Sequence, residues 1–303
     1  MLKKKKWCDK ILIYGLGLMG GSIGLKVKSI GSYSEILGIT RKKESAETAL
    51  NIGAVDKADT NFKEFVSQSD FIIFALPPLK VLQIIEKIFP YIKPTAIITD
   101  VSSVKGKIYY EIEKLVIGNN LKYNKKVSYI GSHPMAGSEK HGIEHAKIDL
   151  FDDSMVFVTP FLDTKKKDML LIREFWHSIG CKTKVITPEL HDVFTAFTSH
   201  FPHLMSGILS NILLDEYNGQ KEIKLAISNS FKDITRVSAS DPSLWTEITL
   251  MNRTNILSVI EKYRDKLDYI RSILKDHNEE KILEFFSVAK KSRNILIKHN
   301  EKN

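Results

Sequence analysis

His133 stands between two turns of small residues, in the segment "GSHPMAGSEKHG". It ends an apolar run, "VSYIGSHP", that predicts a buried strand, and Ser103 ends a similar run, "AIITDVSS". Because the carboxyl ends of parallel strands face the ligand crevice of an open α/β sheet, we expect both side chains to lie beside a bound ligand. An imidazole in that place can accept a proton during a reaction. The alternative is a turn histidine that hydrogen-bonds only to the backbone.

A second group of polar side chains occupies the segment "HDVFTAFTSHFPH". His191, Ser199, His200 and His203 recur there at near-helical spacing, with phenylalanines between them. Polar residues follow this spacing on any solvated helix, but the interleaved phenylalanines require at least one histidine to face a partly buried surface. The segment therefore indicates a helix that contributes polar groups to a site.

Arg236 follows in the segment "FKDITRVSASDPSLW". Its planar guanidinium can form two parallel hydrogen bonds with a carboxylate, which makes it a candidate for binding an acidic ligand. A surface ion pair with Asp233 or Asp241 is the alternative interpretation.

A glycine-rich segment, "GLGLMGGSIG", follows the first predicted strand, "KILIYG". Gly15, Gly17 and Gly20 fill the pattern G-x-G-x-x-G. The three glycines allow a tight turn, a close approach of a pyrophosphate to the backbone, and packing of the following helix on the strand. The anion then lies at the N-terminus of that helix, so Leu18 and Met19 belong to the same cofactor-binding segment. The pattern predicts a nicotinamide or flavin dinucleotide, and a purely structural turn is the alternative.

The second predicted strand, "EILGIT", ends in Thr40, where NAD-binding proteins carry an acidic residue roughly 20 residues beyond the glycine loop. Without that carboxylate, nothing at this position repels the 2′-phosphate of NADP. Arg41 follows directly and can pair with such a phosphate through two hydrogen bonds. The sequence therefore favours NADP over NAD. A solvated basic turn is the alternative, because Glu44 and Glu47 also lie close by.

The segment "HGIEH", at residues 141–145, matches the zinc motif H-x-x-E-H. On a helix, this motif places two imidazoles on one face to bind zinc, with Glu144 as the base. Gly142 weakens the helix that the motif requires, and no clear third ligand follows on a companion helix. We therefore expect no metal site.

The pattern of apolar residues in the sequence changes near Pro188. Before it, short β-rich runs alternate with helical stretches, which predicts a Rossmann-type, doubly wound and mostly parallel sheet over residues 1–187. After it, runs such as "NILSVIEKYRDKLDYIRSIL" carry apolar residues at steps of three and four. Residues 188–303 are therefore expected to form an all-helical domain.

Composition narrows the function further. The chain has 303 residues, of which 43% are hydrophobic and 27% charged, an ordinary balance for a soluble protein. No apolar run approaches the roughly 20 residues of a membrane span, and no secretory signal is recognisable, so we expect a cytoplasmic protein. The net charge of +9 is spread over every helix-like segment without a nucleic-acid-reading motif, which argues for a small anion rather than a nucleic acid as the ligand.

Six segments together resemble the prephenate dehydrogenase family of tyrosine biosynthesis, which includes arogenate and cyclohexadienyl dehydrogenases. In chain order they are "GLGLMGGSIG", "TDVSSVKG", "GSHPMAGSEKHG", "LFDDSMVFVTP", "HDVFTAFTSHFPH" and "FKDITRVSASDPSLW". The third and the last are far more specific than the glycine loop. The resemblance implies a nucleotide-binding domain joined to a helical domain through which two subunits dimerise.

The resemblance also implies a reaction, the oxidative decarboxylation of a cyclohexadienol. Hydride leaves the carbinol carbon for the nicotinamide while the ring carboxylate departs as carbon dioxide, and aromatisation of the ring drives the step. On this basis His133 accepts a hydrogen bond from the ring hydroxyl with help from Ser103, Arg236 holds a substrate carboxylate, and His191 supports the site. Residues implied near the substrate side chain or the site entrance are Ser199, His203 and Glu139.

Two other function classes stay open at this point. A β-hydroxyacid dehydrogenase also combines this form of the glycine loop with a helical second half, and a catalytically dead nucleotide-binding regulator is the non-enzyme alternative. The sequence does not decide between prephenate and arogenate, because one group beside the substrate side chain could determine the choice. It is equally silent on inhibition by tyrosine at the active site and on any assembly beyond a dimer.

Overall fold

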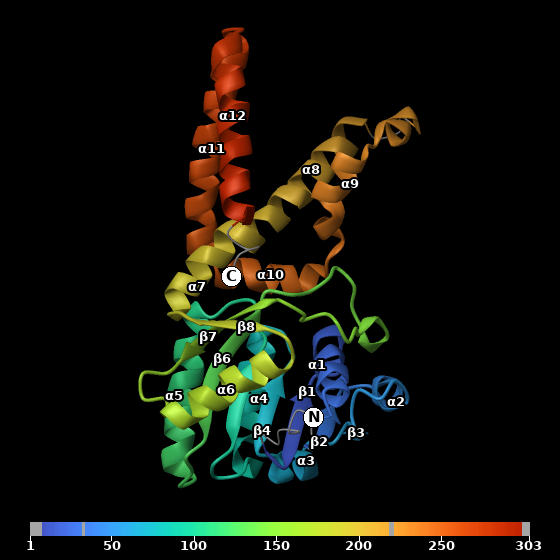
Figure 1. Ribbon diagram of the computed structural model, residues 1–303, viewed down its shortest axis with the longest axis vertical. Coiled ribbons are helices and arrows are strands. Elements are labelled where there is room, and N and C mark those ends of the chain that lie inside the picture. Colours follow the sequence, from blue (N-terminus) through green and yellow to red (C-terminus); the bar gives the residue numbers. More distant parts are fainter. Residues whose placement is uncertain (1–7, 32–33, 218–220, 299–303) are drawn as a thin grey trace. The chain divides into compact units, whose positions relative to one another are not determined.

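A mostly parallel sheet forms the first part of the chain in the computed structural model, which describes residues 8–31, 34–217 and 221–298. Within these residues its eight strands follow the order β3-β2-β1-β4-β5-β6-β7-β8 (Figure 1). Neighbouring strands are parallel from β3 to β6, whereas β7 pairs antiparallel with β6. The strands are β1 Lys10–Tyr14, β2 Glu35–Ile39, β3 Lys57–Asp59, β4 Phe71–Phe74, β5 Ile97–Asp100, β6 Ser128–Pro134, β7 Met155–Pro160 and β8 Lys182–Val185.

The predicted fold class is confirmed, and the four runs predicted as strands form β1, β2, β5 and β6. Strand β3 has no sequence signal, because it is a three-residue edge strand, "KAD", with two exposed positions and therefore no apolar run. The order of the strands reverses direction between β1 and β4, and ligands of open α/β sheets bind at such a switch point.

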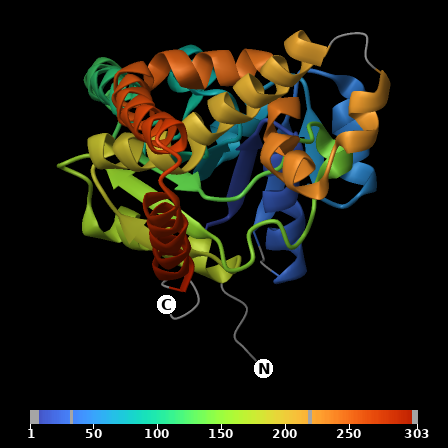
Figure 2. The same cartoon turned by 90° about the horizontal axis from the view of Figure 1, so that it is seen from above.

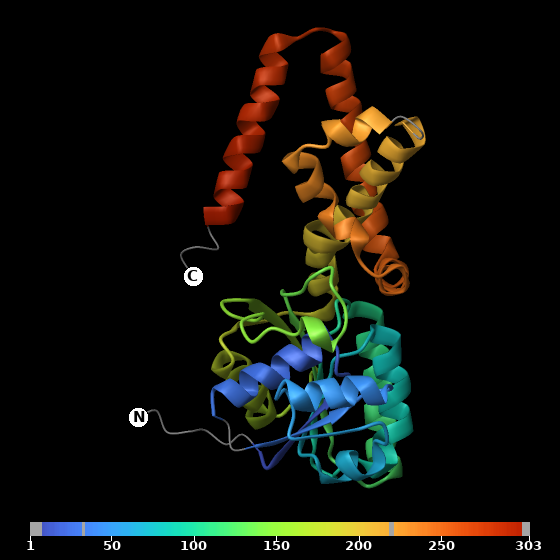
Figure 3. The ribbon, with the colours of Figure 1, turned by 90° about the vertical axis from the view of Figure 1, so that its right-hand side faces the viewer.

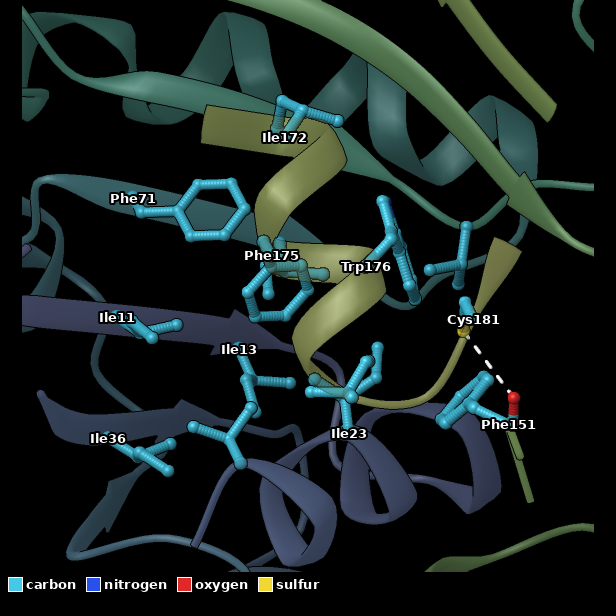
Figure 4. Packing of buried hydrophobic residues seen from close by; sticks show 14 of the residues in the cluster. Ile11, Ile13, Ile23, Ile36, Phe71, Phe151, Ile172, Phe175, Trp176 and Cys181 are labelled. Atoms are coloured by element: carbon cyan, nitrogen blue, oxygen red, sulfur yellow. Dashed lines mark hydrogen bonds between the residues drawn. The ribbon is translucent and has the colours of Figure 1, made fainter. Parts of the chain in front are cut away.

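Helices cover both faces of the sheet, because alternate side chains of each strand point to opposite faces. Ile11 and Ile13 of β1 belong to one buried cluster together with Phe175 and Trp176 of the helix α6 (Figure 4). Leu12, between them, belongs to a second cluster with residues of α4 and α5. The helices of this part are α1 Leu18–Ser29, α2 Lys43–Asn51, α3 Lys63–Gln68, α4 Pro78–Ile88, α5 Gly106–Lys122 and α6 Lys166–Ser178.

Among the described residues, every element from Pro188 onward is helical. In the view of Figure 2, α8 and α10 lie in front of the sheet. Helix α7 packs on α5, and α10 packs on α4. The elements up to Met251 are α7 Pro188–Thr195, the π-helical turn η3 Ala196–His200, α8 Phe201–Tyr217, the 3₁₀ turn η4 Lys221–Ala226, α9 Asn229–Thr235, the 3₁₀ turn η5 Arg236–Ala239 and α10 Pro242–Met251.

The chain divides into two compact units, and the second begins at Thr254. This unit contains α11, Arg253–Lys275, from its second residue onward, and α12, Glu279–Lys298, joined to it by a short turn (Figure 3). Leu283, Phe286 and Leu296 of α12 are each more than 60% exposed. No helix among the described residues combines the length and the hydropathy that a membrane crossing requires.

Candidate active site

The glycine loop has the geometry of a phosphate-binding turn. Gly15 adopts a φ of +110°, and a Cβ there would lie 2.3 Å from the carbonyl oxygen of Ala75. A Cβ on Gly20 would lie 1.9 Å from the carbonyl oxygen of Gly15, so only glycine lets α1 pack this closely on the turn. A Cβ on Gly17 would meet nothing within 4 Å, and no side chain caps α1 at this position. The first N–H groups of α1 are therefore open to an anion.

A cleft of about 730 Å³ opens beside this turn, a size within the usual range for cofactor sites. Thr40, Arg41 and Ser45 line it, whereas Glu44 and Glu47 do not. Leu18 and Met19 do not line the cleft either. They can contact an anion only through their backbone N–H groups, in the first turn of α1. The cleft therefore joins the phosphate-binding turn to the basic segment after β2.

His133 lies at the end of β6, opposite Phe157 of β7, with only 7% of its surface exposed. Its Nδ1 is 2.7 Å from Nε2 of His191, which lies on α7. His191 in turn places Nδ1 2.8 Å from Oδ1 of Asp192. The three side chains form a continuous buried series of hydrogen bonds, which we call the His133–His191–Asp192 chain.

The far end of this chain is fixed by backbone groups. The N–H of Lys105 donates to Oδ1 of Asp192 and the N–H of Gly106 donates to Oδ2, both at 2.8 Å. Because both carboxylate oxygens accept hydrogen bonds, the proton between Asp192 and His191 belongs to Nδ1 of His191. Nε2 of neutral His191 must then accept from Nδ1–H of His133. Nε2 of His133 is left with its lone pair, as a hydrogen-bond acceptor.

Burial keeps both imidazoles neutral. It lowers the pKa of His133 well below its usual value, and the nearby His191, Lys105 and His200 lower this pKa further. Burial also lowers the pKa of His191, but here the hydrogen bond and the charge of Asp192 act in the opposite direction. A neutral imidazole at His133 can act as an acceptor at neutral pH.

Asp100 connects the ends of β5 and β6. It accepts hydrogen bonds from the Lys105 ammonium at 2.7 Å and from the N–H of Ser102 at 3.0 Å, on the segment that follows β5. On β6, the N–H of Ser132 donates to it at 3.2 Å and the hydroxyl of Tyr129 at 2.8 Å. Strands β5 and β6 are neighbours, so this cluster positions the segment that carries Ser103 next to the strand that carries His133.

The second predicted group of polar residues follows the π-helical turn η3 and enters α8. His200 is fully buried, and Asn252 donates to its Nδ1 at 2.9 Å and to the carbonyl of Asp192 at 2.7 Å. Burial lowers the pKa of His200 to about 4. His203 donates from Nδ1 to the carbonyl of Ser199 and stacks on Trp245 with ring centroids 3.4 Å apart. Single π turns inside helices often occur at functional sites.

Arg236 begins the turn η5 and forms an ion pair with Glu139 at 2.5 Å. Neither Asp233 nor Asp241 is its partner, and Asp241 instead caps α10 through the N–H of Leu244. The Arg236 side chain is 59% exposed, so water screens this pair. Its positive charge reaches His203, whose pKa burial lowers first and Arg236 lowers further.

The structure thus connects several residues predicted from separate segments. His133 forms a hydrogen bond with His191, and the rings of His200 and His203 both contact Trp245. Arg236 pairs with Glu139. The sequence analysis did not assign roles to Asp192, Lys105, Asp100 and Asn252. Asp192 directly follows His191, but nothing in that neighbourhood indicates that backbone groups 86 and 87 residues away complete its hydrogen bonds.

The zinc motif does not form in this chain. Residues 143–145 make a single 3₁₀ turn, and Gly142 precedes it with a φ of +91°. This turn lacks the helical face that the motif needs to present two imidazoles together. Among the described residues, no group of three potential metal-ligating side chains comes together.

The glycine turn at the switch point of a parallel sheet, with a buried acceptor histidine at a strand end, defines a dinucleotide-dependent oxidoreductase. Two family models match the chain: the prephenate dehydrogenase nucleotide-binding domain over residues 23–185, and the prephenate dehydrogenase dimerization domain over residues 187–288. The chain belongs to the prephenate dehydrogenase family. Its redox cofactor is a nicotinamide dinucleotide.

Individual relatives agree with the family models. The prephenate dehydrogenase of Bacillus subtilis (strain 168) is 31% identical over 95% of this chain and 76% of its own length. The crystal structure of prephenate dehydrogenase from Aquifex aeolicus, in complex with hydroxyphenyl propionate and NAD+, matches with a TM-score of 0.86 at 29% identity, covering 95% of this chain and 98% of that one. Arogenate dehydrogenase from Synechocystis matches with a TM-score of 0.77 at 28% identity, covering 95% and 99%.

Proposed function

We propose that this chain catalyses the NAD(P)-dependent oxidative decarboxylation of prephenate or arogenate in tyrosine biosynthesis. The observation that carries the proposal is the buried His133, whose hydrogen bond to His191 leaves Nε2 as an acceptor at the end of β6. A reaction that turns a carbinol into a phenol must remove the hydroxyl proton, and a neutral imidazole at this edge of the sheet suits that task. The family match favours this reaction over that of a β-hydroxyacid dehydrogenase.

Each site residue has a distinct task in this proposal. A nicotinamide dinucleotide held by the glycine turn would supply the acceptor for the hydride that leaves the carbinol carbon as carbon dioxide is lost from the ring. His133 accepts the hydroxyl proton at Nε2, and Ser103, on the neighbouring strand end, holds the hydroxyl. Arg236 exchanges Glu139 for a substrate carboxylate, an exchange that its exposed position permits. Ser199 and His203 face the substrate side chain, and Trp245 supports the His203 ring.

The test compares prephenate with arogenate as substrates of the purified chain. Reduced-cofactor absorbance and carbon dioxide release are followed together. We expect at least one of the two substrates to yield reduced cofactor and carbon dioxide in equal amounts. Reduced cofactor without carbon dioxide would instead point to a simple alcohol dehydrogenase.

The proposed cofactor preference is NADP. Thr40, Arg41 and Ser45 line the cleft beside the glycine turn and present hydroxyl and cationic groups, whereas Glu44 and Glu47 are not part of its lining. A 2′-phosphate would find donors there and no carboxylate. The ratio of kcat/KM values for NADP and NAD measures this preference, and a ratio below one would contradict it.

We also propose that the functional division lies at residues 187 and 188, with a homodimer formed through the helical part. One family model ends at residue 185 and the other begins at residue 187, close to this division, whereas the compact units divide after Arg253. Large apolar side chains of the helical part, among them Ile212 and Leu214 of α8 and Leu283 of α12, are more than half exposed. A second copy that covers them would remove this surface from water. Sedimentation of the purified chain at several concentrations, with and without nucleic acid, tests both the dimer and the expected absence of a nucleic-acid partner.

A further inference from the structure

The surroundings of His133 do not stabilise a positive charge on its imidazole. The titratable and charged groups that act on His133 are His191, Lys105 and His200, and none of them is acidic. A positive charge on this ring would be buried beside the Lys105 ammonium, without a carboxylate to stabilise it. Burying an uncompensated charge costs several kcal/mol.

His191 offers the compensation that His133 lacks. Its Nδ1–H donates to Asp192 at 2.8 Å, and Asp192 is held by two backbone N–H groups. Lys105 lowers the pKa of His191 as it does that of His133, but for His191 the hydrogen bond and charge of Asp192 and the charge of Asp100 raise the pKa. An imidazolium at His191 would therefore be one half of a hydrogen-bonded ion pair.

We propose that the substrate proton does not stay on His133 but passes on to His191. This inference rests on the proposed function and makes His191 a positioning residue that also stores the proton. The hydroxyl proton moves to Nε2 of His133, and the proton on Nδ1 of His133 moves along the 2.7 Å hydrogen bond to Nε2 of His191. His133 ends neutral with its proton on Nε2, and His191 ends as an imidazolium paired with Asp192. After the product leaves, the reverse transfers return the proton to solvent.

The transfer makes a specific prediction about pH. In the free enzyme, acid would place the extra proton on His191, whose Nε2–H would then donate to His133 and force the His133 proton onto Nε2. The acceptor is lost, so the acid limb of the kcat/KM profile reports the coupled pair. The charged and titratable groups around this pair are Asp100 on β5, Lys105 before α5, Asp192 on α7 and His200 on η3.

The experiment replaces His191 with glutamine. The variant His191→Gln can still accept a hydrogen bond from His133 but cannot take a proton. We expect kcat to fall roughly tenfold or more. The acid limb should move to lower pH, because only His133 remains to titrate and it lacks a carboxylate. The dependence of kcat on the fraction of deuterated water should change from curved, for two protons in motion, to linear. His177 is an exposed histidine on α6, so His177→Gln is the matched control and should change none of these quantities.

A rate within about threefold of wild type, with the acid limb unmoved, would overturn the transfer. If His191→Gln does not fold, Asp192→Asn keeps both imidazoles and should move the acid limb in the same direction. Histidine NMR on the cofactor-bound wild type, titrated without substrate, separates this inference from the proposed function. The transfer predicts that His191 becomes charged first. Charging of His133 first contradicts the transfer, whereas absence of turnover with both substrates contradicts only the proposed function.

Discussion

The glycine turn and the His133–His191–Asp192 chain are built by opposite means. The turn spans six residues, and its geometry follows from backbone conformation, with Gly15 at a φ of +110° and Gly20 against the carbonyl of Gly15. The histidine chain joins β6, α7 and the start of α5. Its links are buried hydrogen bonds, two between side chains and one from the backbone N–H of Lys105 to Asp192. Local sequence can specify the first, whereas only the complete fold can assemble the second. The comparison teaches that the phosphate-binding turn is specified by neighbouring residues, whereas the groups that handle the proton come from distant segments of this chain.

The substitution His133→Asn should have the largest effect, because it removes the proton acceptor and leaves the glycine turn untouched. We expect kcat to fall about a hundredfold to ten-thousandfold with cofactor affinity unchanged. Steady-state rates and cofactor binding are measured on the same preparation, with His177→Asn as the control. Near wild-type kcat would show that another group accepts the proton.

Stability should fall with acid, because the buried histidines are neutral in the folded state. The pKa of His200 is about 4 when folded, against 6.5 as its ordinary value, so below pH 6.5 the unfolded chain binds the proton first. The stabilisation is therefore complete above pH 6.5 and is lost as the pH falls toward 4. For His200 alone it amounts to about 3 kcal/mol.

Urea unfolding at a series of pH values across this window measures the loss. His200→Gln removes one titrating group and should make the decline shallower. An equal slope in the variant would show that His200 does not contribute to it.

The substitution Arg236→Gln should weaken substrate binding and leave the histidine chain intact. Loss of a hydrogen bond to a charged group costs roughly 1.5–3 kcal/mol, so KM should rise by about tenfold to a hundredfold with a smaller change in kcat. Arg173→Gln, on α6, is the matched control. An unchanged KM would mean that the pair with Glu139 is structural only.

The substitution Arg41→Ala should have the smallest effect and should be confined to cofactor choice. The ratio of kcat/KM for NADP over NAD should fall about tenfold, while the rate with saturating NAD changes little. Lys43→Ala is a suitable control because Lys43 does not line the cleft. If Arg41→Ala leaves the NADP-to-NAD ratio of kcat/KM unchanged, Arg41 does not bind the 2′-phosphate.

Sequence reasoning predicted the elements whose signal is local. The glycine pattern and the apolar runs placed Gly15, Gly20 and the strands correctly, because a turn and a strand are set by neighbouring residues. The edge strand β3 gave no signal, since an exposed three-residue strand has no apolar pattern. The partner of Arg236 also could not be predicted, because Glu139 lies 97 residues earlier in the chain.

The role of Asp192 was missed because its other hydrogen-bond partners lie far away in the chain. Asp192 accepts from the backbone of Lys105 and Gly106, and such contacts have no sequence pattern. The resemblance pointed to His191 only as a supporting residue. Its contact with His133 depends on the packing of α7 on α5, which a single sequence does not specify.

The most direct test of the account follows one deuterium atom from substrate to cofactor. Prephenate and arogenate, each deuterated at the carbinol carbon, are incubated with the chain and oxidised cofactor. The account predicts reduced cofactor that carries the deuterium, together with one carbon dioxide for each molecule reduced, from at least one of the two substrates. Reduced cofactor without deuterium, or no reduction by a chain that still binds the cofactor, would contradict it.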